Sequence, residues 1–378
     1  MHHHASLLAP PYATAPTVTI DLGAIAANYR YLKQRVAPAE CAAVVKTNAY
    51  GLGLEPVADA LAKADCRSFF IANAENGGHL RRQLPDATIF VFHGVASKEE
   101  AAFAAEYQLT PVVNTRRQLA FWQTEAKRRG HALPAALQVD TGITRLGFDE
   151  AEAKLLAEDA AALDGVDVVL IMNHLGCSFE EDHPLTQRQI REFEVMKQWF
   201  PQARRSLVNS AGLFFKAGCC GDLVRPGGAL YGLNPSTAEP VMPMQCAVKL
   251  EAPILQIRTL SQDETVGYAA SYHAKKGDRL ATLAIGYADG LIHAATNCGH
   301  VWVAGHTVPI VGKVSMDLTT IDISALPEDA VQEGDLVEIY GPNRSFQDLA
   351  NEAGTASYEL FTSLGPRVHR QYINKPTA

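Results

Sequence analysis

The chain has 378 residues, of which 47% are hydrophobic and 20% are charged, and its formal net charge is -8. This composition is typical of a folded globular protein and excludes a disordered chain, while the acidic balance argues against a nucleic-acid binder. No apolar stretch is long enough to span a membrane, and we expect no secretory signal because no basic region precedes a long apolar core.

The first sixteen residues are predicted to be a tag and a flexible leader, with His2–His4 as part of an affinity tag and an Ala- and Pro-rich stretch behind it. The chain has seven cysteines, an odd number, and no C-x-x-C spacing. This pattern favours reduced thiols in a cytoplasm over a disulfide framework, and we expect no metal site. The cysteines are Cys41, Cys66, Cys177, Cys219, Cys220, Cys246 and Cys298.

In chain order, a strand is predicted at Thr17–Leu22 and a helix at Ala24–Val36. From residue 41 to 232, eight short apolar runs then alternate with amphipathic stretches such as "EPVADALAKA". This alternation indicates βαβ units, and eight units favour a (β/α)8 barrel. An open doubly wound sheet is the alternative, but "GLGLEP" lacks the third glycine of a dinucleotide fingerprint. The runs are Cys41–Lys46, Ser68–Asn73, Thr88–His93, Thr110–Asn114, Pro134–Asp140, Val166–His174, Arg204–Ser210 and Leu223–Gly232.

The pattern changes after residue 241, where runs such as "AVKLEAPILQIRTL", "HVWVAGHTVPIVGKV" and "DLVEIYG" read as strands broken by Gly and Pro. We therefore predict a barrel domain over 17–240 and a mostly β domain over 241–378. The first strand, at Thr17–Leu22, could pack with the C-terminal domain instead of the barrel.

Chemically useful side chains gather at the predicted carboxyl ends of the strands, where barrel enzymes build their active sites. Lys46 ends an apolar run, and a lysine there is costly to desolvate unless it is paired or chemically used. Each of these residues alone has an ordinary explanation, such as a surface ion pair, a core histidine or a turn serine. Their convergence favours a site where the lysine acts as a base or forms a Schiff base. The others are Asp140, Arg145, His174, Asn209, Ser210 and Arg225.

Six motifs carry a resemblance to a known family. "AVVKTNAYGLG", "VDTGITRLGF", "NSAG", "VRPGGALYG", "GYADG" and "VGKVSMD" together resemble alanine racemase, and the resemblance extends from about residue 17 to residue 370. It implies a barrel that binds pyridoxal 5'-phosphate, followed by a β domain, and an enzyme that interconverts L- and D-alanine and supplies D-alanine for peptidoglycan.

The resemblance also implies residue roles. Lys46 would hold the cofactor covalently and serve one face of the substrate, and Tyr268 would serve the opposite face, as a two-base racemisation requires. His174 and Arg225 would assist the tyrosine, with Arg225 facing the pyridine nitrogen. Arg145 and the backbone N–H of Met316 would hold the substrate carboxylate. The cofactor cradle would also include Tyr50, Asn209, Ser210, Gly227 and Gly228, and the supporting residues would be Gln138, Tyr287 and Asp317.

In the family, the counterparts of Tyr268 and Met316 complete the active site of the other subunit, so a head-to-tail homodimer is implied. The sequence departs from the family at three places. Gln138 stands where a carbamylated lysine is common, so we expect no carbamate, although the amide could hydrogen-bond Arg145. Pro366 replaces a tyrosine, and Ser315 replaces a cysteine.

Three other functions are compatible with parts of the pattern. A serine or broad-spectrum amino-acid racemase would share the fold. A decarboxylase of basic amino acids would share the barrel, but Tyr268 stands where a racemase needs its second base. A non-enzymatic cofactor carrier would not need the C-terminal domain that brings Tyr268 and Met316.

Overall fold

The computed structural model describes residues 14–215, 221–233 and 244–376. The chain divides into two compact units: Leu22–Gln245 with the last few residues, and the residues up to Asp21 with Cys246–Ile373. The tag at residues 2–4, most of the expected leader, residues 234–240 of the predicted barrel, and the adjacent cysteines at 219 and 220 lie outside the described residues. Within the described ranges, no helix is long and apolar enough to cross a bilayer.

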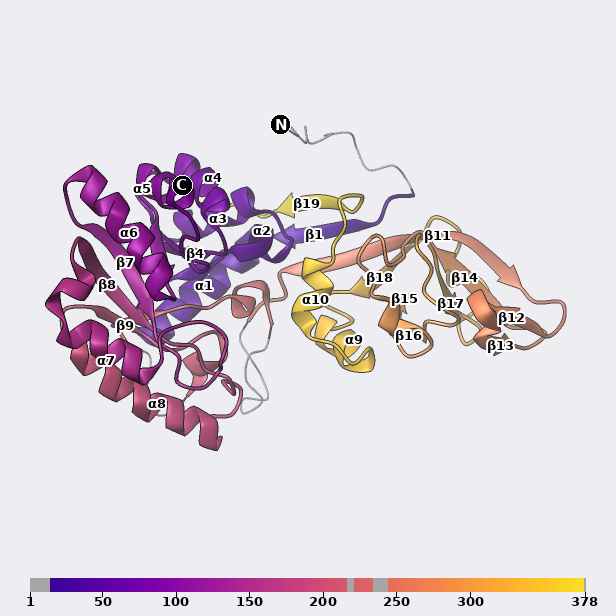
Figure 1. Cartoon of the computed structure of the whole chain (residues 1–378). Coiled ribbons are helices and arrows are strands. Elements are labelled where there is room, and N and C mark those ends of the chain that lie inside the picture. Colours follow the sequence, from indigo (N-terminus) through magenta and orange to yellow (C-terminus); the bar gives the residue numbers. More distant parts are fainter. Residues whose placement is uncertain (1–13, 216–220, 234–243, 377–378) are drawn as a thin grey trace. The chain divides into compact units, whose positions relative to one another are not determined.

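The larger unit is built on parallel strands that alternate with helices packed outside them (Figure 1). In its described part, seven strands pair in chain order from β3 to β9, as successive βαβ units require. The strands are β3 (Ala43–Val44), β4 (Ser68–Ile71), β5 (Thr88–Val91), β6 (Thr110–Val113), β7 (Leu133–Gln138), β8 (Val166–Met172) and β9 (Arg204–Ser206). The helices are α1 (Leu22–Val36), α3 (Leu54–Lys63), α4 (Ala74–Gln83), α5 (Lys98–Glu106), α6 (Arg116–Arg129), α7 (Glu150–Glu158) and α8 (Pro184–Met196).

An eighth strand closes the ring. Strand β10 (Leu223–Val224) pairs in parallel with β2 (Glu40–Cys41), which leads into β3 through Ala42. On its other side, the N–H of Arg225 donates to the carbonyl of Val208, just beyond β9, at 3.1 Å. These pairings confirm the predicted (β/α)8 barrel and exclude the open doubly wound sheet.

The eight barrel strands are all shorter than the predicted runs, and the last and the first run show the physical reasons. The run Leu223–Gly232 is extended only over β10, because Pro226 has no N–H for a ladder and the glycines after it start the 3₁₀ turn η4 (Gly228–Tyr231). The first run stops before Lys46, which opens the short helical element α2 (Lys46–Tyr50) instead of ending a strand.

The second unit is mostly β-sheet. Its first strand, β1 (Thr17–Asp21), pairs antiparallel with β11 and parallel with β19, so residues from the two ends of the chain share one sheet. The unit also has two short helices that the sequence analysis did not anticipate, α9 (Phe346–Glu352) and α10 (Ser357–Thr362). Its other strands are β11 (Val248–Thr259), β12 (Glu264–Val266), β13 (Tyr272–Ala274), β14 (Arg279–Leu283), β15 (His300–Val303), β16 (His306–Pro309), β17 (Thr319–Asp322), β18 (Leu336–Tyr340) and β19 (His369–Ile373).

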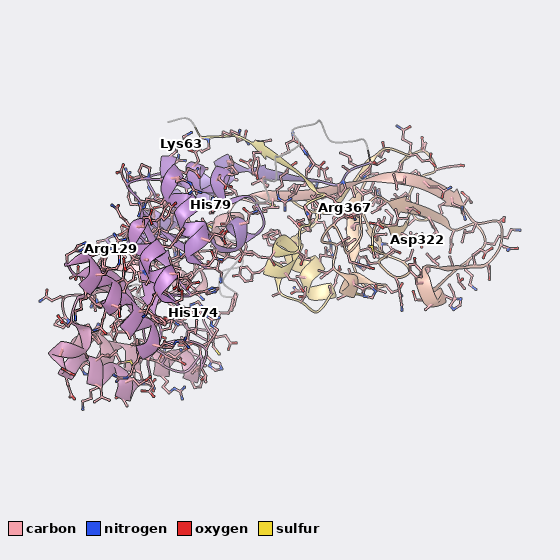
Figure 2. All side chains as sticks on the ribbon, turned by 45° about the horizontal axis from the view of Figure 1, so that its top comes forward. Lys63, His79, Arg129, His174, Asp322 and Arg367 are labelled. Carbon is pink, nitrogen blue, oxygen red and sulfur yellow. The ribbon has the colours of Figure 1, made fainter. Side chains whose placement is uncertain are left out.

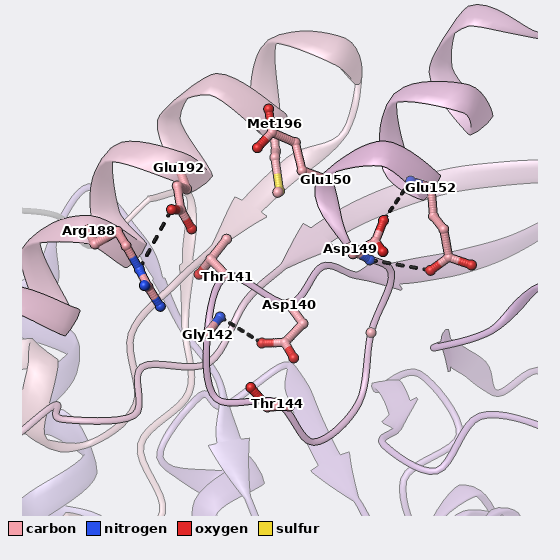
Figure 3. Close-up of a pocket in the computed structure, with 11 residues that line it drawn as sticks. Asp140, Thr141, Gly142, Thr144, Asp149, Glu150, Glu152, Arg188, Glu192 and Met196 are labelled. Carbon is pink, nitrogen blue, oxygen red and sulfur yellow. Dashed lines mark hydrogen bonds and ion pairs between the residues drawn. The ribbon is translucent and has the colours of Figure 1, made fainter.

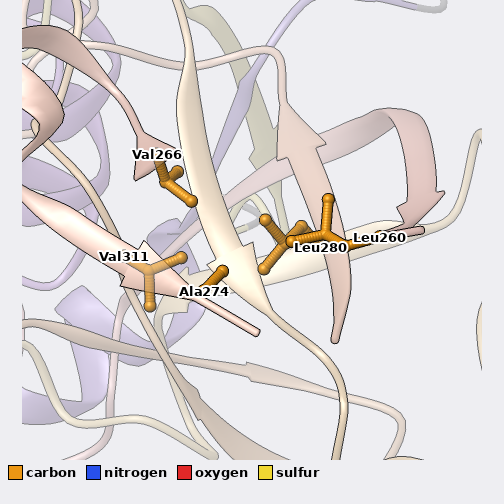
Figure 4. Close-up of a cluster of buried hydrophobic side chains, with 5 residues drawn as sticks. All are labelled: Leu260, Val266, Ala274, Leu280 and Val311. Carbon is orange, nitrogen blue, oxygen red and sulfur yellow. The ribbon is translucent and has the colours of Figure 1, made fainter. Parts of the chain in front are cut away.

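The β12–β13 hairpin carries Tyr268 near its tip, in the turn η5 (Tyr268–Ala270). A small apolar cluster fixes the base of this hairpin, since Val266 and Ala274 from its two strands are buried with residues of neighbouring segments (Figure 4). The turn that carries Tyr268 is therefore supported by strands whose side chains are packed in this cluster. The cluster consists of Leu260, Val266, Ala274, Leu280 and Val311.

Candidate active site

Lys46 lies at the barrel mouth, at the start of a left-handed turn. The next three residues have φ between 50° and 55° and ψ between 48° and 53°, and Tyr50 follows with φ 58°. None of them is glycine, and each L residue in this region costs about 1 kcal/mol or more. The turn is a hydrogen-bonded one, because Ala49 donates to the carbonyl of Val45 at 3.0 Å and Gly51 to that of Thr47 at 2.8 Å. Strain of this kind is concentrated at functional sites.

The side chain of Lys46 is exposed in the single chain, and its surroundings still disfavour the protonated amine. Desolvation by the barrel mouth and, to a smaller extent, the positive charge of Arg145 lower the pKa of Lys46. Its amino nitrogen lies 5.9 Å from the centre of the Phe92 ring, which stacks on Phe70. Lowering the pKa of a lysine makes it a better nucleophile or base near neutral pH. This is the chemistry that the sequence predicts for Lys46, as a base or as a Schiff-base lysine.

A cradle for an anion forms where Tyr50 meets the segment after β10. A Cβ atom at Gly227 would overlap the hydroxyl of Tyr50, so only glycine lets the tyrosine approach this backbone. The hydroxyl of Ser210 accepts from the N–H of Gly227 at 2.9 Å and from that of Ala229 at 3.3 Å. Gly228 opens the turn η4 at the same place. Hydroxyls and turn amides of this kind, at the late strands of a barrel, are typical of phosphate sites.

Asn209 supports this cradle from the neighbouring loop. Its side-chain oxygen accepts from Ala211 N–H at 3.1 Å, which orders the turn η3 (Ala211–Phe214) next to Ser210. Its amide nitrogen donates to the hydroxyl of Ser178 at 3.0 Å, and Ser178 is buried. The loop after β8 is thus tied to the cradle.

Arg225 is a buried cation held by neutral acceptors. It donates to the hydroxyl of Ser206, to the carbonyl of Asn173 at 2.6 Å and to that of Leu207 at 3.3 Å. Burial lowers the pKa of Arg225 to about 9. Nearby, burial and then the charge of Arg225 lower the pKa of His174 to about 3, so this imidazole is neutral over the physiological range. His174 is labelled in Figure 2, where it lies on the barrel unit.

Arg145 extends from an exposed loop after β7. Gln138 is buried, and its amide nitrogen donates to the carbonyl of Leu146 at 2.8 Å, the residue next to Arg145. The expected contact between Gln138 and Arg145 is thus replaced by one to the adjacent backbone. Asp140 accepts from the N–H groups of Gly142 and Ile143 at 2.9 and 3.0 Å, which makes it a turn residue.

A pocket of about 440 Å³ lies beside this loop (Figure 3). Its charged side chains are mostly carboxylates, and Arg188 pairs with Glu192 at 3.6 Å. Lys46 is not among the residues that line it, so the pocket is a feature separate from the anion cradle. The acidic side chains are Asp140, Asp149, Glu150, Glu152 and Glu192.

The remaining predicted residues belong to the C-terminal unit and are exposed in the single chain. Tyr268 is 72% exposed, Met316 54% and Tyr287 45%. The turn at Met316 is ordered by backbone bonds, since Tyr287 N–H donates to Ser315 and Ala288 N–H donates to Met316, each at 3.0 Å.

Asp317 anchors the same turn. Its carboxylate is 2.7 Å from Nη1 of Arg367, which also contacts Asp289. This agrees with the ordering role expected for Asp317. The structure therefore gathers the predicted residues in two sets, one at the barrel mouth and one around Met316.

Several residues that order these sets were missed by the sequence analysis. Asn173, Ser206 and Ser178 are buried polar residues next to predicted site residues, and a search for polar side chains at apolar strand ends could have found the first two. Arg367, which follows Pro366, was also missed. Its partners lie far away in sequence, so no local pattern indicates them.

The barrel mouth fits pyridoxal phosphate. A lysine with a lowered pKa suits the aldehyde, and the glycine gap beside Tyr50 and the Ser210 hydroxyl suit the phosphate. Among the residues that the structure describes, no carboxylate accepts a hydrogen bond from Arg225. No cluster of metal-ligating side chains occurs in the described ranges.

Comparison with known proteins gives a consistent result. Residues 20–235 match the alanine racemase N-terminal domain and residues 247–372 match the alanine racemase C-terminal domain. A catabolic alanine racemase of Mesorhizobium japonicum is 44% identical over 96% of this chain and 94% of its own length. The crystal structure of alanine racemase from Bartonella henselae with covalently bound pyridoxal phosphate has a TM-score of 0.90, 38% identity, and coverage of 95% of this chain and 99% of that chain. The Bacillus anthracis enzyme with bound L-Ala-P has a TM-score of 0.85, 28% identity, and coverage of 97% and 96%.

A closed βα barrel with a lysine of lowered pKa and an anion cradle at its mouth, joined to a β-rich unit, defines a barrel enzyme that depends on pyridoxal phosphate. The two domain matches and the relatives above 40% identity place the chain in the alanine racemase family. It is a pyridoxal phosphate-dependent amino-acid racemase, as the resemblance implied.

Proposed function

We propose that this chain interconverts L-alanine and D-alanine with Lys46 and Tyr268 as the two proton-transferring groups. One group removes the α-proton from one face of the substrate, and the other delivers a proton to the opposite face. The observation that carries the proposal is the lowered pKa of Lys46 at the mouth of the barrel, next to the Tyr50–Gly227 cradle. Bound pyridoxal phosphate would supply the electron withdrawal that makes the α-proton acidic.

The barrel unit would hold the cofactor. Lys46 would bind its aldehyde, and Tyr50, Ser210 and the backbone of Gly227 and Gly228 would hold its phosphate, with Asn209 ordering the adjoining loop. Arg225 would hold its ring nitrogen. Because a guanidinium does not readily give up its proton, Arg225 would leave this nitrogen unprotonated, which would weaken the electron withdrawal and disfavour side reactions.

The substrate carboxylate would be held by Arg145 and by the backbone N–H of Met316. Gln138 holds the carbonyl next to Arg145, and Asp317 holds the turn at Met316 through Arg367. Tyr287 would line the entrance to the site. His174 stays neutral and can accept a hydrogen bond in the chain that adjusts the basicity of Tyr268.

We propose further that two copies of the chain share each site, with the barrel of one copy facing the C-terminal unit of the other. The support is the exposure of Tyr268, Met316 and Tyr287, because side chains with a catalytic or gating role are normally enclosed in the working enzyme. The five described cysteines are free thiols, which favours a cytoplasmic location.

The D-alanine product would supply peptidoglycan synthesis. Two relatives are named catabolic alanine racemases, so alanine degradation is the competing cellular role. A strain that lacks its alanine racemases and carries this gene separates the two roles: growth without added D-alanine supports the supply role, and growth only with it contradicts that role.

The experiment that tests the reaction is solvent-deuterium exchange at Cα. The protein with pyridoxal phosphate is incubated with L-alanine in D2O, and the product is analysed by NMR and chiral chromatography. We expect deuterated D-alanine from the wild type. When each enantiomer is used in turn, Tyr268→Phe should exchange the α-proton of only one of them and without inversion, because Lys46 alone serves a single face. Loss of both exchange reactions in Lys46→Ala is also expected. Racemisation by Tyr268→Phe at the wild-type rate would contradict the two-base assignment.

A serine or broad-spectrum racemase is the alternative, and Pro366 in place of the family's tyrosine is the feature that favours it. Serine and lysine run beside alanine in the same experiment decide between them. Alanine turning over fastest supports the first proposal, and faster serine or lysine turnover supports the alternative.

A further inference from the structure

The left-handed turn from Thr47 to Tyr50 needs something to hold it. Four consecutive residues other than glycine have φ between 50° and 58°, a conformation that L residues rarely adopt in succession. Lys46 precedes the turn and Tyr50 ends it, so the turn sets the spacing between the amine and the phenol of the barrel mouth. A relaxation of the turn to a right-handed or extended form would move one relative to the other.

Asn48, in the middle of this turn, makes two contacts to residues beyond it, one of them through its side chain. Its side-chain oxygen accepts from the N–H of Leu54 at 2.7 Å, and its carbonyl accepts from the N–H of Gly53 at 2.9 Å. Asparagine is also among the residues that tolerate the left-handed region best. One side chain and one carbonyl thus join the middle of the turn to the residues that follow it.

These contacts attach the turn to helix α3. The helix begins after Gly53, which offers no side chain to cap it. Asn48 therefore performs the capping function from six residues upstream. Helix α3 is a firm support because Val57, Ala58 and Leu61 on its inner face are fully buried. The strained turn is held by a helix that the barrel packing keeps in place.

We propose that Asn48 is a positioning residue for the cofactor: its bond to Leu54 stabilises the left-handed turn and so keeps Lys46 and Tyr50 in the arrangement that binds pyridoxal phosphate. Asn48 itself is exposed, and its side-chain oxygen is engaged by the Leu54 N–H, so its role is to act through the turn. The inference rests on the roles proposed above for Lys46 and Tyr50.

The test measures the cofactor dissociation constant of the full chain, by equilibrium dialysis with absorbance of the lysine-bound chromophore. Asn48→Ala loses the acceptor and should raise this constant by about two- to thirty-fold, the range for loss of a capping bond. Asn48→Asp keeps an acceptor and should stay within about two- to three-fold of the wild type. Asn48→Gly accepts the left-handed conformation freely but has no acceptor, so it should bind more weakly than Asn48→Asp.

A matched control is Ser345→Ala, which removes the capping hydroxyl of helix α9 in the other unit, where it accepts from Gln347 at 3.0 Å. We expect a similar loss of unfolding free energy but an unchanged cofactor dissociation constant. Amide hydrogen exchange of the cofactor-free protein adds a second readout, because the Leu54 amide should exchange faster in Asn48→Ala than in Asn48→Asp.

Two results would overturn the inference: a wild-type dissociation constant in Asn48→Ala, or an equal rise in Ser345→Ala. The proposed function is tested separately by Lys46→Ala. If that variant still forms the lysine-bound chromophore and racemises alanine, the assignment of Lys46 fails, whatever Asn48→Ala shows.

Discussion

Arg367 joins Asp289 at the centre of the C-terminal unit: Nη2 of the arginine is 3.0 Å from Oδ1 of a carboxylate that is only 3% exposed. The other oxygen of Asp289 accepts from the N–H of Gly286 at 3.0 Å. A Cβ atom at Gly286 would overlap the carbonyl of Met316, so the segments around residues 286 and 316 are in direct contact. The same guanidinium reaches Asp317 at 2.7 Å. One arginine therefore connects the turn that carries Tyr287 with the turn that carries Met316.

Arg367→Met should loosen this connection. It leaves Asp289 buried with fewer partners, and we expect the free energy of unfolding to fall by about 1–2 kcal/mol, a moderate value because the arginine side chain is half exposed. The KM for alanine should rise more than kcat falls, since the Met316 N–H would bind the carboxylate less well. Denaturant unfolding and steady-state kinetics measure both. Adding Asp289→Asn should recover part of the stability, and no recovery would refute the buried-charge explanation.

Gly227→Ala should damage the cofactor site through a steric conflict. The new methyl group would overlap the Tyr50 hydroxyl and lie 3.0 Å from its Cζ atom. We expect the affinity for pyridoxal phosphate to fall by about tenfold or more, equivalent to about 1.4 kcal/mol. In a protein that already carries Tyr50→Phe, the hydroxyl is gone, so adding Gly227→Ala should reduce the cofactor affinity less than it does in the wild type. An equal reduction in both proteins would mean that the methyl group conflicts with another atom.

His174 should make stability depend on pH in the acid range. Its pKa is lowered from 6.5 to about 3, so between these values the unfolded chain binds a proton that the folded chain does not. The free energy of unfolding therefore decreases as the pH falls from 6.5 towards 3, and it increases again as the pH rises. The change is at most about 1.4 kcal/mol per pH unit. Unfolding free energies from about pH 4 to about pH 7 should have a smaller slope in His174→Gln than in the wild type. The exposed His131→Gln is the control, and an equal change there would contradict the assignment.

Gln138→Leu should weaken substrate binding with little change in cofactor binding. The amide bond to the Leu146 carbonyl holds the loop of Arg145, and losing such a bond costs about 0.5–1.5 kcal/mol, which corresponds to a rise in KM of about two- to tenfold. Native mass spectrometry of the wild type should show no labile adduct with the mass of carbon dioxide. Such an adduct, or activity that depends on dissolved bicarbonate, would contradict the prediction of a carbamate-free site.

Much of the fold was predictable because its signals are local. Alternating apolar runs and amphipathic stretches indicate βαβ units, and parallel units place their carboxyl ends at one rim, so Lys46, Arg145, His174 and Arg225 could be expected near one another. The change of pattern after residue 241 likewise indicated a β-rich region. The short extent of β10 was not foreseen, since a run of apolar residues does not show where Pro226 interrupts the ladder.

The type of fold, the family and the residues at the strand ends could be inferred from the sequence. Their signals, hydrophobic periodicity and short motifs, each lie within a few tens of consecutive residues. Tertiary structure alone decided the left-handed turn after Lys46, the neutral partners of Arg225 and the bridge from Arg367 to Asp289. The partners of Arg225 and Arg367 come from segments far apart in the chain that meet only when the sheets form. The left-handed turn has nearby partners, but the helix that holds it is kept in place by the packing of the barrel. Burial and charge, which set the pKa values of Lys46 and His174, follow from the same packing.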